Sequence, residues 1–155
     1  MTKFPRLALS AALIAAALPG AALANNASGQ VKLKGTVALT CTVAVQDMNE
    51  SLDLVNGEAN QSVGTVVETC NSGSGYTISL SSSNGGALVS DTGTAPVAYS
   101  VSYDGQGGSL GSALSVSRNG AQFGRQATLA VNVQGNAQAL AGNYSDTVTI
   151  TIAAK

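Results

Sequence analysis

The sequence predicts an all-β protein built as an antiparallel sandwich, and three observations support this prediction. Apolar and polar residues alternate repeatedly with a period of two, which is typical of strands with one buried and one solvated face. Turn signals that contain glycine separate these runs, and no sustained helical stripe occurs. Short alternating strands punctuated in this way favour an antiparallel sandwich or barrel.

The first 24 residues have the composition of a secretory signal. Lys3 and Arg6 precede an apolar stretch that ends in Ala22-Leu23-Ala24, after which we expect cleavage. Pro19-Gly20 breaks this stretch, which is also shorter than the roughly 20 residues that a spanning helix needs. We therefore expect secretion, without membrane insertion.

The composition excludes several function classes. The chain has 155 residues, with 7 Lys+Arg, 8 Asp+Glu and no His or Trp. Loss of the leader removes Lys3 and Arg6, so 131 residues with five basic and eight acidic side chains remain, a net charge of -3. A chain without histidine has neither an imidazole general base nor an imidazole metal ligand. A net charge of -3 also offers no basic surface on which nucleic acid could bind. We predict no enzyme activity, no catalytic or metal-binding residue, no cofactor and no nucleic-acid partner.

Five alternating runs predict the strands, and residues 52–69 fit no single parity, so we expect a bulge there. The runs are 31–45, 76–81, 97–104, 129–133 and 144–152, and the turn signals are Asn56-Gly57, Asn84-Gly85-Gly86, Asp104-Gly105, Gly107-Gly108 and Asn119-Gly120. The Gly/Ser-rich stretches 71–75, 81–86 and 105–112 are expected to be loops.

The first run is too long for one strand. At about 3.3 Å per residue, residues 31–45 would span roughly 50 Å, so we expect two strands divided near Thr40, with an interruption at Gly35. The second half begins at Cys41, and an oxidising compartment favours a single disulfide between Cys41 and Cys70. Nothing in the sequence ties the first half to its own domain. An amphipathic strand of this kind is suited to adding itself to the open sheet of another molecule.

These residues together resemble a known family. Gly29-Gln30-Val31, Cys41-Thr42-Val43, Cys70, the run 76–80, Val97-Ala98-Tyr99-Ser100-Val101 and the ending 141–152 occur in the order and spacing of the spore coat protein U domain family. Its best-known members are pilins of the archaic (Csu-type) chaperone-usher pili. The resemblance covers essentially the whole mature chain.

The resemblance implies an incomplete immunoglobulin-like antiparallel β-sandwich that lacks its final strand and is completed by donor-strand complementation. It divides the chain into a signal peptide (1–24), an N-terminal donor segment (25–40) and a pilin-like domain (41–155). It implies that Cys41 and Cys70 bridge the first two strands. The implied donor side chains are Val31, Leu33, Val37 and Leu39, and the implied wall of the acceptor groove is Val148, Ile150 and Ile152.

The implied function is that of a structural subunit of a surface pilus, supporting adhesion and biofilm formation. Its implied partners are other copies of itself or related pilins, a periplasmic chaperone and an outer-membrane usher, and its final location is the cell surface. Residues 140–144 also resemble a tyrosine corner, in which the Tyr144 hydroxyl bonds back to nearby backbone. Tyr76, Tyr99 and Tyr103 occupy the positions of their runs that alternate with polar residues, so we expect them to be core residues.

Two alternatives remain open from the sequence. The chain could be a secreted spore or cell-coat matrix protein whose N-terminal strand completes its own sandwich. It could also be a small carbohydrate-binding adhesive module, although the absence of Trp disfavours a sugar-stacking platform.

Overall fold

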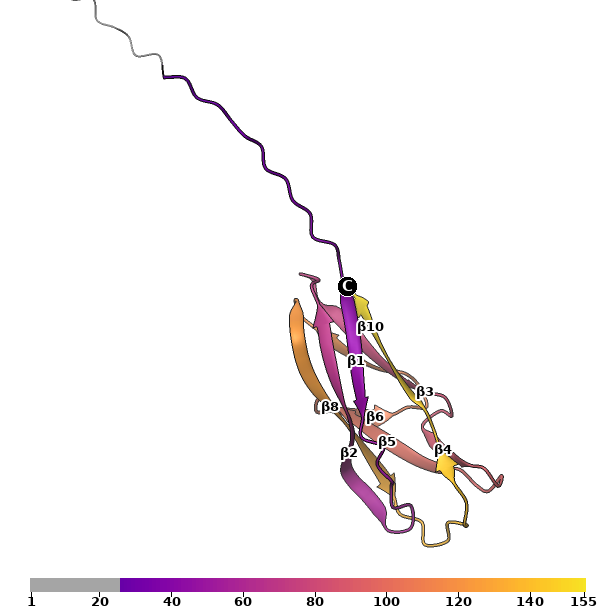
Figure 1. Cartoon of the computed structure of the whole chain (residues 1–155). Helices are drawn as coiled ribbons and strands as arrows, with labels where there is room; N and C mark the ends of the chain where they lie inside the picture. The colour runs from indigo at the N-terminus through magenta and orange to yellow at the C-terminus, as the bar shows by residue number, and fades with distance from the viewer. Residues whose placement is uncertain (1–25) are drawn as a thin grey trace, which may run out of the picture. The chain divides into compact units, whose positions relative to one another are not determined.

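The computed structural model describes residues 26–155, and the predicted signal peptide lies outside them. The chain divides into two units, Met1–Gly35 and Thr36–Lys155. Between residues 26 and 155 the secondary structure consists of ten strands and no helix (Figure 1). Accordingly, no helix in this described part is long and apolar enough to cross a membrane. The strands are β1 Cys41–Asp47, β2 Gly57–Cys70, β3 Tyr76–Ser82, β4 Ala87–Ser90, β5 Val97–Tyr103, β6 Gln106–Ser109, β7 Leu114–Arg118, β8 Gln122–Gln134, β9 Tyr144–Ser145 and β10 Val148–Ala154.

The strands form two antiparallel sheets. The larger sheet has the order β1-β2-β8-β5-β4-β9, with β6 paired to β5, and the smaller sheet has the order β10-β3-β7. Every paired neighbour is antiparallel. The prediction of an all-β, antiparallel, immunoglobulin-like sandwich is therefore confirmed.

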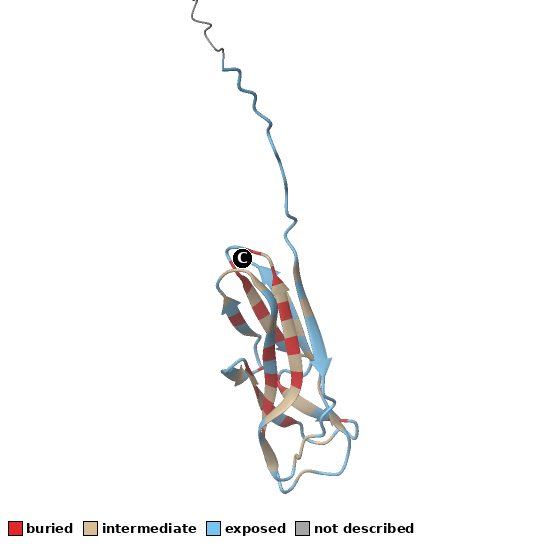
Figure 2. Ribbon diagram, turned by 60° about the vertical axis from the view of Figure 1, so that its left-hand side comes forward, coloured by how far each residue is buried: buried red, intermediate tan, exposed pale blue. Residues whose placement is uncertain are grey.

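The core lies between the sheets and is built from alternate residues of the strands, which Figure 2 shows as buried segments alternating with intermediate or exposed ones. One face of a strand is buried and the other is solvated because successive side chains point to opposite sides. The larger sheet contributes Val66, Tyr99, Val101, Tyr103, Ala127, Leu129, Val131 and Val133, and the smaller sheet contributes Tyr76, Ile78, Leu80 and Val116. The expectation that Tyr76, Tyr99 and Tyr103 are core residues is confirmed, since all three are buried.

The long strand β2 explains why residues 52–69 fit no single parity. Its pairing with β8 shifts register between Glu58 and Gln61, between Ser62 and Gly64, and between Glu68 and Thr69. Irregularities of this kind interrupt the alternation in the first half of β2, whereas Val66, Glu68 and Cys70 in its second half keep one buried parity. The predicted bulge is confirmed.

Two turn predictions have different outcomes. Asp104 and Gly105 both have positive φ, of 50° and 79°, and form the two-residue hairpin between β5 and β6, as predicted. The predicted turn at Gly107-Gly108 is wrong, because both residues lie in β6 and pair with β5. The hairpin at Asp104-Gly105 aligns the following residues with β5, and this pairing outweighs the weak strand propensity of glycine.

The predicted C-terminal strand 144–152 is not continuous. Tyr144 and Ser145 form β9, which pairs with β4 in the larger sheet, whereas Val148–Ala154 form β10, which pairs with β3 in the smaller sheet. Asp146 lies at the change of sheet, where it accepts hydrogen bonds from the backbone of Thr147 and Asn84.

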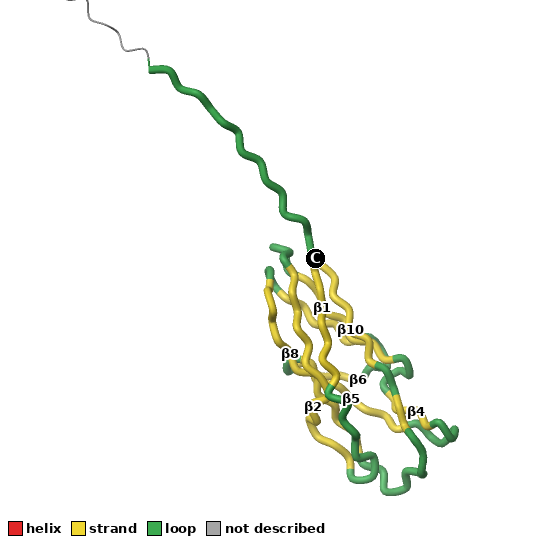
Figure 3. The backbone as a smooth tube through the Cα atoms, in the orientation of Figure 1, coloured by secondary structure: helices red, strands yellow, loops and turns green. Residues whose placement is uncertain are grey.

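The predicted N-terminal strand is also absent from this single chain. Residues 26–40 contain no strand, and Figure 3 draws them as loop. A strand exists only where a neighbouring strand accepts and donates its backbone hydrogen bonds. Val31, Leu33 and Val37 are 87%, 90% and 89% exposed, so these side chains are not covered by other residues of the described range 26–155.

Candidate functional site

The candidate site is a groove between the two edge strands β1 and β10. In the described chain β1 pairs only with β2, and β10 pairs only with β3, so each strand has one edge without a partner. The two strands lie next to each other in opposite sheets and run in opposite directions (Figure 1). Unpaired backbone groups along such edges are free to bind a further strand.

The groove has a volume of about 700 Å³ and an apolar floor with a polar rim. Val45 of β1 and Val148 and Ile150 of β10 line its two sides. The floor consists of Leu52, Leu54, Val63, Leu88, Leu129 and Val131, and the rim includes Asp47, Asn49, Glu50, Ser51 and Asn143. A cavity with this lining favours an extended apolar segment, because alternate side chains can be buried while the backbone pairs at both edges.

The three residues predicted to form the acceptor wall all lie on β10, but only two of them line the groove. Val148 and Ile150 line the groove, whereas Ile152 is half-buried against the core further along β10. Thr149 and Thr151 alternate with them on the exposed face. The larger part of the floor comes from β2, β4 and β8 and from residues 52–54, which sequence reasoning did not assign to the groove.

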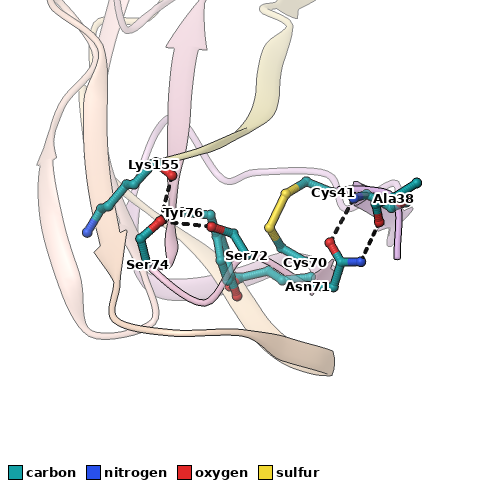
Figure 4. The surroundings of a disulfide bond; sticks show 10 residues. Ala38, Cys41, Cys70, Asn71, Ser72, Ser74, Tyr76 and Lys155 are labelled. Carbon is teal, nitrogen blue, oxygen red and sulfur yellow. Dashed lines mark hydrogen bonds between the residues drawn. A yellow bond between two sulfur atoms is a disulfide. The ribbon is translucent and has the colours of Figure 1, made fainter. Parts of the chain in front are cut away.

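The disulfide lies at the opposite end of β1 from the groove-lining residue Asp47. Cys41 and Cys70 face each other in the β1–β2 register and are joined, so the predicted bridge is confirmed (Figure 4). The C-terminus is anchored at the same end, where the Lys155 N–H donates to the Gly75 carbonyl at 3.0 Å. The start of β1 and the end of β10 are thus both fixed close to residues 70–75.

Tyr144 lies at the rim of the groove, at the start of β9. Its hydroxyl donates to the Leu140 carbonyl at 2.9 Å and also contacts the Thr94 hydroxyl at 2.9 Å. The bond to backbone four residues upstream is the geometry that a tyrosine corner requires. This hydrogen bond fixes the loop 140–144, which leads into β9 at the rim of the groove.

Asp146 organises the same rim. Its carboxylate accepts hydrogen bonds from the hydroxyls of Ser82 and Tyr99 as well as from the backbone of Asn84 and Thr147. Burial raises the pKa of this carboxyl, but the four hydrogen bonds lower it more, and the net pKa lies below the usual value. Burial and the hydrogen bond to this carboxylate together raise the pKa of Tyr99, which therefore stays protonated as a donor.

A buried carboxylate, Glu68, connects the two sheets away from the groove. It accepts hydrogen bonds from Tyr76 and Tyr103, both at 2.6 Å, and binds Arg118 through two N–H groups at 2.8 and 2.9 Å. Burial raises the pKa of Glu68, but the Arg118 and tyrosine hydrogen bonds outweigh it, so the pKa is lowered. Burial and the carboxylate raise the pKa of Tyr76 to about 12. Sequence reasoning missed this cluster, although Glu68 shares the parity of the buried residues Val66 and Cys70.

The geometry defines a sandwich with an open groove. Among residues 26–155 no group of three or more His, Cys, Asp or Glu side chains could hold a metal ion. The family model of the Spore Coat Protein U domain matches residues 25–151, and the chain belongs to this family. The family prediction made from the residues is confirmed.

Solved structures and curated sequences give two further findings. The crystal structure of the minor tip subunit HdaB of the Hda pilus of E. coli is similar, with a TM-score of 0.38 and 16% sequence identity. The likeness covers 72% of this chain and 79% of that chain. Among curated proteins, none matches this chain in sequence.

Proposed function

We propose that this chain is a structural subunit of a surface pilus of the archaic chaperone-usher type, polymerised by donor-strand exchange. The observation that carries the proposal is the groove with an apolar floor between β1 and β10, each of which has one edge without a partner in the described chain. Membership of the Spore Coat Protein U domain family supports it.

The N-terminal segment is the proposed occupant of the groove in the next copy. It carries exposed apolar residues at alternate positions, which is the pattern needed to fill an apolar floor from one face of a strand. Lys32 and Lys34 alternate with Val31 and Leu33 and would stay on the solvated face. Each inserted Val or Leu contributes about 1.5–3 kcal/mol when it is fully buried.

The ends of the domain support one direction of insertion. The chain leaves the body at Thr40, which is held by Asn71. At the same end β10 stops at Ala154, and the following residue, Lys155, is held by Gly75. A donated strand antiparallel to β10 would leave the acceptor at the far end, beside Asp47 and Val148. The opposite direction would bring the donor's body to the end from which the acceptor's own segment leaves. Head-to-tail assembly with the donor antiparallel to β10 avoids this collision.

The same groove requires temporary cover before assembly. Exposed apolar grooves and free strand edges promote aggregation, so we propose that a periplasmic chaperone fills the slot until an outer-membrane usher exchanges it for the next subunit. In this proposal residues 1–24 direct export, and the assembled pilus supports adhesion and biofilm formation at the cell surface.

Leu33→Asp tests the proposal, with Lys34→Asp as a matched control that introduces the same side chain one position further on. The purified assembly is run in SDS without boiling, since donated strands form long-lived junctions. We expect a ladder for the wild type and for Lys34→Asp, and single subunits for Leu33→Asp. A ladder that survives Leu33→Asp contradicts donor-strand exchange.

The same preparation separates the two alternatives left open by the sequence. A matrix protein that completes its own sandwich gives wild-type monomers on the unboiled gel. A carbohydrate-binding module gives saturable glycan binding by the wild-type domain that Leu33→Asp leaves unchanged.

A further inference from the structure

The residue that follows the disulfide, Asn71, holds the base of the N-terminal segment on its own domain. The Asn71 N–H donates to the Thr40 carbonyl at 3.1 Å, which continues the β1–β2 ladder by one bond. The Asn71 side chain then accepts from the Thr40 N–H at 2.8 Å and donates to the Ala38 carbonyl at 2.7 Å (Figure 4). These contacts all lie within the unit Thr36–Lys155.

The side-chain amide takes the place of a neighbouring strand. A primary amide offers both an acceptor oxygen and N–H donors, so it presents to residues 38–40 the groups that a backbone would present. The Cys41–Cys70 disulfide and the buried Cys70 fix the backbone from which this amide projects. Residues 38–40 therefore prolong β1 on their own domain.

The hydrogen bonds of Asn71 limit which residues can be donated to another copy. A strand inserted into the slot must present one backbone edge to β1 and the other to β10 of the acceptor. Both backbone groups of Thr40 and the carbonyl of Ala38 are already bound to Asn71. Residues 38–40 consequently have only one free edge.

Two independent observations separate Leu39 from the other apolar residues of the segment. Leu39 is 65% exposed, whereas Val31, Leu33 and Val37 are 87–90% exposed. Residues 31–37 are seven in number, which equals the length of β1 and of β10, the two strands that form the slot. A donor that continued to Leu39 would be longer than both.

We propose that Asn71 is a positioning residue that sets the C-terminal limit of the donated strand. Resting on the proposed donor-strand exchange, this inference assigns Val31, Leu33 and Val37 to the groove of the next copy. Leu39 stays with its own domain, and Val37 is the last donated side chain, beside Val148 at the end of the acceptor groove.

The test compares Val37→Ala with Leu39→Ala in polymers of the mature chain. The readout is the temperature at which each polymer dissociates in SDS. We expect Val37→Ala to lower this temperature and Leu39→Ala to leave it unchanged. Equal lowering by the two variants overturns the inference while leaving donor-strand exchange intact. A wild type that forms no polymer refutes the proposed function, and this inference falls with it.

The role of the Asn71 side chain has its own readout, the exchange rate of the Thr40 amide. We expect Asn71→Ala to accelerate this exchange about five- to tenfold, as for the loss of one hydrogen bond, and Asn71→Asp, which keeps the acceptor, to preserve the protection. Asn119→Ala, at an exposed position in the loop between β7 and β8, is the control and should change nothing. Unchanged Thr40 exchange in a folded Asn71→Ala variant overturns the assignment.

Discussion

Replacing Glu68 with alanine is expected to destabilise the sandwich more than any other single loss of charge described above. Glu68 lies on β2 and Tyr103 on β5 of the larger sheet, whereas Tyr76 on β3 and Arg118 on β7 belong to the smaller sheet. The carboxylate is fully buried and the Arg118 side chain is 10% exposed. Its removal therefore disrupts a connection between the sheets in a place that water does not reach.

The magnitude follows from the groups that lose their partner. Removing one member of a buried ion pair costs about 3–5 kcal/mol, because the remaining charge stays buried without its counterion. Arg118 keeps Asp104 at 2.9 Å, which limits this cost, but two buried tyrosine hydroxyls lose their acceptor. Domains of this size have about 5–15 kcal/mol of stability in total, so the variant should retain a much reduced margin.

Urea unfolding at about pH 7 measures the effect, with Glu50→Ala as the control that removes the same charge from an exposed position. We expect a loss of about 3–5 kcal/mol for Glu68→Ala and a smaller loss for Glu68→Gln, which keeps the shape and one acceptor. A Glu68→Ala loss no larger than that of Glu50→Ala would refute this explanation of the network.

The pH dependence of the free energy of unfolding tests the contribution of ionised Glu68 to stability. The pKa of Glu68 is lower in the folded protein than its usual value of 4.5, so the unfolded state binds the proton more readily. The stabilisation is therefore complete above 4.5 and is lost as the pH falls through the folded pKa. The difference in stability between the wild type and Glu68→Ala should shrink as the pH falls below about 4.

Three further predictions concern the disulfide, the groove and its rim. Replacing Cys41 and Cys70 together with serine should lower the free energy of unfolding by roughly 3.6 kcal/mol, from loop closure over a separation of 29 residues, and a reductant should then destabilise the wild type but not the variant in urea unfolding. Ile150→Asp should abolish the SDS-resistant ladder, whereas Thr149→Asp on the exposed face should preserve it; a ladder in both variants would contradict the assigned groove wall. Asp146→Asn leaves one acceptor oxygen for four donors and should cost about 1–3 kcal/mol in thermal unfolding, and a change of only a few tenths would show that the rim does not depend on this carboxylate.

The strands of the body were largely predictable from the sequence because side-chain alternation depends on local geometry alone. The runs near Tyr76, Val97 and Leu129 fall in β3, β5 and β8. Alternation reports which face a residue occupies, but it does not report the partner strand. This is why Tyr144 and Val148, which share a parity, were placed in one strand although they belong to different sheets.

The groove was predictable only along one wall. Val148, Ile150 and Ile152 form a clean alternating run, and two of them line the groove. The floor is assembled from segments as distant as Leu52 and Val131, whose proximity depends on the sheet order β1-β2-β8-β5. No local pattern contains that order, so single-sequence reasoning could not assemble the site.

Two polar features were missed for a similar reason. Glu68 follows the buried parity of β2, but its four hydrogen bonds come from β3, β5 and β7, which are remote in sequence. Asn71 next to a cysteine is an ordinary loop residue until the disulfide places it opposite Thr40. Buried charges and capping amides of this kind are recognisable only when their partners are in place.

Amide hydrogen exchange on the purified polymer and on the isolated subunit tests most directly whether a neighbour's N-terminal segment fills the slot. We expect residues 31–37 and the open edges of β1 and β10 to exchange freely in the subunit and to become protected together in the polymer, while β3, which is paired in both, stays the same. Protection of residues 31–37 already in the isolated subunit, or free exchange of these residues in the polymer, would contradict the account.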